Sequence, residues 1–171
     1  MMRKKAVIVG LAFLLLMEMP ACSMDQTSLS SVDEAGLVET PASAEGKQVR
    51  MTSGEVEVLI TLNDSKAAAD FVRMLPLELT LIERNDFAKG MTLPRNLVTD
   101  EETTREYEIG DFGYWDAGPD LAIFYDDIYE QTIVPVVPMG KAESGAENMR
   151  NTSGTVRLEL ISDDENRAKN G

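Results

Sequence analysis

Apolar and polar residues alternate along much of the chain beyond residue 48, which is the pattern of strands with one buried face. Helical spacing occurs over 66–75, where the run follows a capping Ser65 and stops at Pro76, and a second short helix is predicted over 142–149. The segment 85–104 has neither pattern and is expected to be rich in loops. The runs that the alternation predicts as strands are 49–52, before a turn at 53–54, and then 56–62, 77–83, 111–115, 121–125, 133–137 and 155–161.

Seven or eight short strands with one or two short helices predict a mainly β protein. A closed or nearly closed barrel removes the exposed edges that a flat sheet would leave. Pro135 interrupts the run 133–137, which indicates an edge or a bulge at that strand. The barrel domain is predicted over 48–162, and a disordered tail over 163–171.

The greatest aromatic density lies in the segment 110–125, which holds the only tryptophan of the chain. Two strands flanking a turn at 117–120 predict a β-hairpin. Alternation places Phe112 and Tyr114 on one face of the first strand and Trp115 on the other. One of these two sets is therefore expected in the core.

The N-terminus has the order of parts that is typical of a secretory signal: basic residues at 3–5, apolar residues at 6–17, and a small residue before Cys22. The apolar run is shorter than the roughly 20 residues of a membrane-spanning helix. Cys22 is the only cysteine and stands where the signal would be cleaved, which resembles a bacterial lipoprotein signal. Residues 1–21 would then be removed and Cys22 lipidated; the alternative is an ordinary signal with an incidental cysteine.

Residues 22–47 are mainly Ser, Thr, Glu, Ala and Gly, with few large apolar side chains. Such a composition cannot bury enough surface to offset the entropy of ordering, so it predicts a flexible tether. A poorly ordered terminus without a role has the same composition. With the lipid anchor, the tether predicts an extracytoplasmic protein on a bacterial cell membrane, either periplasmic or on the outer surface.

The formal net charge of −14 limits the possible partners. A strongly acidic protein is repelled by phosphate backbones, which argues against nucleic-acid binding. It also argues against a polybasic attraction to anionic lipids, so the acyl chain on Cys22 is the expected membrane contact.

The absence of histidine excludes Ser-His-Asp and Cys-His catalysis and the commonest transition-metal ligand. No glycine-rich phosphate loop stands between a strand and a helix. Asp126, Asp127 and Glu130 could bind calcium, but the EF-hand spacing is missing, and a solvated acidic loop is the other reading. The sequence thus predicts no metal, no cofactor and no catalytic residue.

The aromatic hairpin is the best candidate for a recognition surface, because its rings could line a groove for an apolar or proline-bearing ligand. The alternative is that all of these residues serve only packing. An arginine near the groove, Arg95 or Arg84, could supply a donor if catalysis occurs. The candidate ligand-binding residues are Tyr114, Trp115, Phe124, Tyr125, Met139 and Arg95.

Several segments, 69–77, 110–115, 121–125 and 139–145, resemble the bacterial cyclophilin-like domain family. The resemblance covers about 49–161. It implies a closed eight-stranded β-barrel with short helices, in agreement with the strand count reached from the alternation.

The resemblance to cyclophilins that catalyse prolyl isomerisation is more distant, since their Phe-His-Arg core has no counterpart here. Arg84, which follows a strand, stands in a segment that does not match that core. Two alternative functions are therefore considered. One is a lipid-anchored binding module for an unidentified peptide or small apolar ligand, and the other is a degenerate extracytoplasmic peptidyl-prolyl isomerase.

Replacement of the predicted anchor tests the membrane location. Cys22→Ser should release the protein from the membrane fraction into the soluble fraction, or leave it unprocessed, because no thiol remains to carry the acyl chain. Fractionation and mass spectrometry of the wild type measure this. An unmodified Cys22 in the mature wild-type protein would rule out the lipoprotein assignment.

Overall fold

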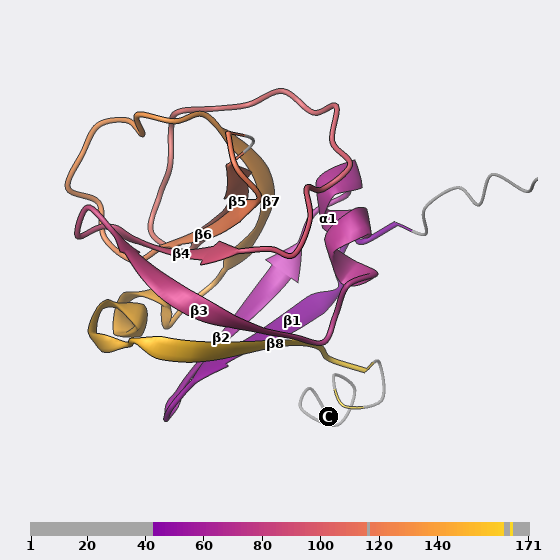
Figure 1. The fold of residues 1–171 in the computed structure, drawn as a ribbon, viewed down its shortest axis with the longest axis horizontal. Helices are drawn as coiled ribbons and strands as arrows, with labels where there is room; N and C mark the ends of the chain where they lie inside the picture. Colours follow the sequence, from indigo (N-terminus) through magenta and orange to yellow (C-terminus); the bar gives the residue numbers. More distant parts are fainter. Residues whose placement is uncertain (1–42, 116, 163–164, 166–171) are drawn as a thin grey trace, which may run out of the picture. The chain divides into compact units, whose positions relative to one another are not determined.

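The computed structural model describes residues 43–115, 117–162 and 165. Eight antiparallel strands close into a barrel in the order β1-β2-β7-β5-β6-β4-β3-β8 (Figure 1). Closure leaves no strand edge without a partner in this sheet, and the predicted eight-stranded barrel is confirmed. The strands are β1 (Gln48–Ser53), β2 (Val56–Leu62), β3 (Leu77–Arg84), β4 (Ala88–Thr92), β5 (Asp111–Trp115), β6 (Asp120–Phe124), β7 (Val136–Ala142) and β8 (Gly154–Leu160).

The barrel interior is filled by the inward residues of every strand, as the alternation predicts. Two short helices add apolar side chains to this core. Helix α1 (Lys66–Val72) is capped by Ser65, whose hydroxyl accepts from the backbone N–H of Ala68 at 3.1 Å. Its Phe71 ring packs against the Phe112 ring at 5.6 Å. The 3₁₀ helix η1 (Ala146–Asn151) contributes Ala146 and Met149.

A second apolar cluster lies on the outer face of the barrel, over β4, β5 and β6. Along β6, Leu121 and Ile123 belong to the interior core, whereas Ala122 and Phe124 belong to the outer cluster. The segment after β3 and the segment before β5 bring the Phe87 and Tyr107 rings onto Phe124. Strand β6 is therefore buried on both faces. The other members of the outer cluster are Phe87, Ala88, Tyr107, Val136 and Trp115.

The hairpin predicted at 110–125 is confirmed as β5 paired with β6, with Trp115 opposite Asp120. Three other predictions were wrong. Strand β4 lies in the segment 85–104, which was predicted to be loop. The pattern does not reveal this strand, because Gly90 and the continuously buried residues 88–91 break the alternation. Strand β7 begins at Val136, beyond Pro135, rather than at Ile133. The second helix is a 3₁₀ helix that begins at Ala146.

The packed part of the structure begins a few residues before β1. Ala44 is fully buried, and the backbone N–H of Gly46 donates to the Leu62 carbonyl at 3.0 Å. Packing thus begins within the last residues of the predicted tether. The predicted signal with Cys22, the tether up to residue 42 and all of the predicted tail except Glu165 lie outside the described residues. Among the helices that are described, none is long and apolar enough to span a membrane.

Truncation of Phe124 tests the importance of the outer cluster. Its ring is 1% exposed, so Phe124→Ala should lower the free energy of unfolding by about 3–5 kcal/mol through lost burial and a residual cavity. Val98→Ala, at a side chain that is 63% exposed, is the control and should change it by less than about 0.5 kcal/mol. Denaturant melts measure both. A loss under about 1 kcal/mol for Phe124→Ala would mean that the outer cluster is not part of the stable core.

Candidate binding pocket on the outer face of the barrel

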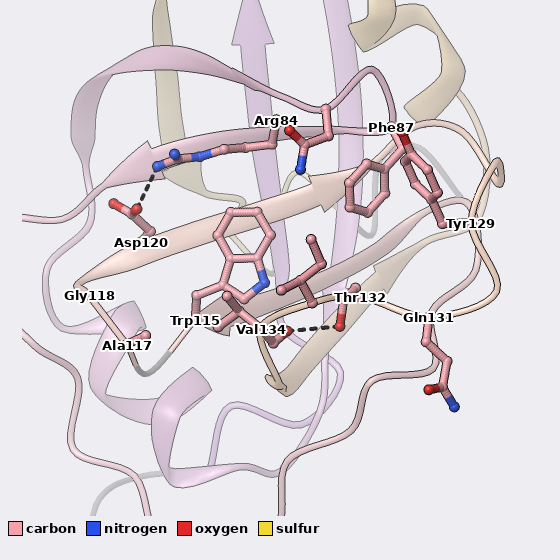
Figure 2. A pocket seen from close by; sticks show the side chains of 12 residues that line it. Arg84, Phe87, Trp115, Ala117, Gly118, Asp120, Tyr129, Gln131, Thr132 and Val134 are labelled. Carbon is pink, nitrogen blue, oxygen red and sulfur yellow. Dashed lines mark hydrogen bonds and ion pairs between the residues drawn. The ribbon is translucent and has the colours of Figure 1, made fainter.

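A pocket of about 610 Å³ opens on the outer face of the barrel, beside the outer cluster (Figure 2). Its walls come from the end of β3 and the following turn, from the β5–β6 hairpin, and from the segment 129–134 that leads toward β7. The lining residues are Arg84, Asn85, Phe87, Trp115, Ala117, Gly118, Asp120, Tyr129, Gln131, Thr132, Ile133 and Val134.

Trp115 forms the centre of the pocket. It is the last residue of β5 and points outward because the preceding Tyr114 points into the barrel. The indole packs edge-on against the Phe124 ring, at a centroid distance of 6.4 Å and an interplanar angle of 85°. Its Nε1 is buried and has no hydrogen-bond acceptor within the described part of the chain.

Arg84 forms the polar wall. Its Nη2 donates to Asp120 Oδ2 at 2.7 Å, and its guanidinium lies 5.6 Å from the centre of the Trp115 ring. The side chain crosses the strand over Gly90, where a Cβ atom would stand 2.7 Å from Arg84 Nε. A glycine in the middle of β4 thus leaves the space that Arg84 occupies. The buried Arg84 Nε also has no acceptor among the described residues.

The aromatic wall is formed by Phe87 and Tyr129, whose rings meet edge to face at 5.3 Å and 82°. Behind them, the Tyr107 ring lies 5.1 Å from Phe87 and 4.7 Å from Phe124. The Tyr107 hydroxyl accepts from the backbone N–H of Tyr129 at 3.0 Å. Burial raises the pKa of the Tyr107 hydroxyl above its usual value.

The rim of the pocket is apolar and exposed. The side chain of Ile133 is 79% exposed, that of Tyr129 is 49% exposed and that of Val134 is 36% exposed. This segment is nevertheless fixed to its neighbour, because Thr132 N–H donates to the Arg105 carbonyl at 2.8 Å and the Arg105 guanidinium donates to the carbonyls of Thr132 and Ile133. The exposed apolar residues are therefore presented by an anchored segment.

A model of the cyclophilin-like family matches residues 51–160. The chain belongs to the cyclophilin-like family. Among curated proteins, none matches it.

Two solved structures share the architecture of this cyclophilin-like protein. A hypothetical protein from Archaeoglobus fulgidus matches with a TM-score of 0.56 and 17% identity, over 71% of this chain and 99% of that one. McbB, solved in complex with tryptophan, matches with a TM-score of 0.51 and 11% identity, over 68% of this chain. The match spans 47% of McbB, about half its length. At these identities the likeness shows the fold alone.

Of the residues predicted to bind ligand, Trp115 lines the pocket. Tyr114 and Met139 lie in the barrel interior, and Phe124 is buried beneath the pocket in the outer cluster. These three serve packing in the cyclophilin-like barrel, which is the alternative that the sequence left open. Of the three, Phe124 packs against the Trp115 ring, and none lines the pocket.

Tyr125 is also buried and points into the barrel, where it joins a group of charges. Its hydroxyl donates to Glu83 at 2.7 Å, and Glu83 accepts from Lys89 at 2.5 Å. The Lys89 ammonium lies 5.5 Å from the Tyr125 ring. Burial, with the neighbouring Glu83 carboxylate, raises the pKa of Tyr125. This group fixes the turn after β3, on the opposite side of the strand from the Arg84 side chain.

Arg95 does not line the pocket. Its guanidinium donates to both oxygens of Asp70 on helix α1, at 2.6 and 2.9 Å, and the Val98 N–H donates to the same carboxylate at 2.9 Å. The hydrogen bond from Arg95 holds the pKa of the buried Asp70 below its usual value. Arg95 thus ties the segment after β4 to the helix.

Most of the pocket lies outside the residues that the sequence predicts as a site. Arg84 is predicted only as a possible donor, and Phe87, Tyr129, Ile133 and Val134 have no predicted binding role. The apolar residues in the irregular segment between β6 and β7 were the sequence feature that could have indicated this pocket. As to metals, no group of three or more acidic or cysteine side chains suited to an ion occurs in the described ranges. Asp126 is paired with Arg150.

The ion pair of Asp70 predicts a pH dependence of stability. Because the folded-state pKa of Asp70 is lowered, its carboxylate stabilises the fold above the unfolded pKa of about 3.9, and this stabilisation is lost as the pH falls through the folded-state pKa. The stability difference between wild type and Asp70→Asn should therefore be large at pH 7 and narrow below about pH 4. Denaturant melts across this range measure it, with Glu45→Gln as the exposed control. A difference that is independent of pH would contradict the role of the charged pair.

Proposed function

We propose that this protein is a non-catalytic binding module that holds a peptide or a small apolar ligand in the outer-face pocket. The volume of about 610 Å³ lies within the range of roughly 300–1,000 Å³ that is typical of ligand sites. The aromatic walls and the exposed Ile133 offer apolar surface that a ligand would remove from water. Exposed apolar surface around a concave site is a mark of interaction sites.

The observation that carries the proposal is the pair of unpartnered donors at the pocket. Trp115 Nε1 and Arg84 Nε are buried without acceptors in the described ranges. Such groups are uncommon in folded proteins, and each lowers stability by about 1–3 kcal/mol. Both atoms are buried, but each belongs to a side chain that lines the same pocket, so a ligand carrying carbonyl oxygens could satisfy them by turning these side chains toward it. The expected ligand is therefore an apolar molecule that carries hydrogen-bond acceptors.

A second candidate is a degenerate peptidyl-prolyl isomerase, and the position of Arg84 is the observation in its favour. Isomerisation needs a donor aimed at the twisted amide. The Arg84 guanidinium is at the pocket, but Asp120 accepts one of its hydrogen bonds and offsets its charge. This pairing weakens Arg84 as a source of electrostatic stabilisation, which supports binding over catalysis.

We also propose that the module belongs to the cell envelope, as the signal-like sequence before Cys22 favours. Lipidation of Cys22 and a tether beyond it would hold the barrel near a membrane, with the pocket available to extracytoplasmic ligands.

The geometry of Arg84 permits a test that leaves every lining side chain unchanged. Gly90→Ala places a Cβ against Arg84 Nε and should displace this side chain into the pocket, weakening an apolar peptide about tenfold or more. Val98→Ala is the control, since Val98 is 63% exposed and does not line the pocket. Calorimetric titration of the full chain carrying Cys22→Ser with a short capped Leu-Phe-Val peptide measures both. Equal affinities would show that the peptide does not use this pocket.

The same protein tests the isomerase alternative with a proline-containing peptide. Uncatalysed isomerisation takes tens to hundreds of seconds, so even weak catalysis is measurable. We expect a rate no different from the uncatalysed one. Catalysis that is lost in Arg84→Ala and kept in Arg95→Ala would replace the binding module with an isomerase.

A further inference from the structure

The charges around the pocket define its ligand more narrowly. Within the pocket, Arg84 and Asp120 form an ion pair, so the lining has no net charge from these two residues. The segment that supplies Tyr129 and Gln131 to the lining also carries Asp127 and Glu130, both exposed. Neither of these two carboxylates has an ion pair among the described residues.

Nearby cations offset only part of this negative charge. Arg150 is paired with Asp126 and lies over the Tyr125 ring at 5.1 Å. Arg105 keeps its positive charge while it donates to the carbonyls of Thr132 and Ile133, but the exposed Glu106 follows it in the chain, so negative charge stays in excess around this segment. The negative charge of Asp127 acts on the aromatic wall, since it adds to burial in raising the pKa of Tyr107.

Apolar surface continues from the pocket toward the same carboxylates. Ile128 is 49% exposed and does not line the pocket, yet it stands between Asp127 and the lining residue Tyr129 in the chain. A ligand that covers Ile128 and also fills the pocket must extend beyond the 610 Å³ of the pocket itself. Chain-like ligands meet this requirement better than compact ones.

We propose that the ligand is a peptide segment in which an apolar residue that fills the pocket is flanked by lysine or arginine. The inference rests on the proposed function and adds the charge of the ligand to it. The apolar residue contacts Trp115, and the flanking cations meet Asp127 and Glu130. An overall charge of −14 attracts such a segment from a distance and repels an acidic one.

Three short capped peptides with the same Leu-Phe-Val core and flanks of lysine, glutamine or glutamate test this, with the full chain carrying Cys22→Ser in a calorimetric titration. At about 50 mM salt, the lysine peptide should bind about 3- to 10-fold more tightly than the glutamine peptide, and the glutamate peptide more weakly. The difference should shrink at about 0.5 M salt, where exposed charges are screened.

Two charge-matched double variants locate the effect. Asp127→Asn with Glu130→Gln should remove the advantage of the lysine peptide, whereas Glu45→Gln with Glu55→Gln, near the ends of β1, should keep it. Retention of the advantage in the first variant would overturn the inference. So would equal binding of all three peptides, which would leave the proposed pocket intact. Failure of all three to bind would overturn the proposed function as well.

Discussion

Burial of strand β6 on both faces is the constraint on which the rest of the structure depends. Alternation sends Leu121 and Ile123 into the barrel and Phe124 outward, so closing the barrel satisfies only one face. The outer face needs its own cover, and Phe87 and Tyr107 supply it from segments on either side. The pocket forms where the Phe87 and Tyr107 rings no longer cover the outer face, and Trp115 is exposed to the pocket there.

The polar wall of the pocket depends on a single small residue. Gly90 allows Arg84 to lie flat across the sheet and reach Asp120, so that the guanidinium borders the indole without filling the pocket. A larger residue in this position would force the arginine outward. The shape of the pocket thus depends on the missing side chain at Gly90 as well as on the residues that line it.

The architecture could be predicted from the sequence because most strands show a clear period of two. The β5–β6 hairpin and the opposite faces of Tyr114 and Trp115 followed from that period. Strand β4 could not be found this way, since its inward face carries Lys89, which is buried by pairing with Glu83, and its outward face carries Gly90. A buried lysine and a missing side chain both remove the apolar alternation.

The site was less predictable, because aromatic density does not distinguish a core from a surface. Phe124 and Tyr125 are as aromatic as Trp115, yet they are 1% and 2% exposed. Whether a ring lines a pocket depends on which segments fold over it, and those segments are irregular. The exposed Ile133 and Tyr129, which carry the apolar rim, belong to such a segment and have no period to detect.

The claim that this pocket binds a ligand is tested most directly by the nitrogen-bound proton of the indole ring. Trp115 is the only tryptophan, so a ¹H–¹⁵N NMR spectrum contains one indole signal. Titration with the capped Leu-Phe-Val peptide should shift this signal together with the amide signals of Tyr129 and Gln131, while those of β1 stay in place. An unchanged indole signal at peptide concentrations that saturate binding would contradict the account.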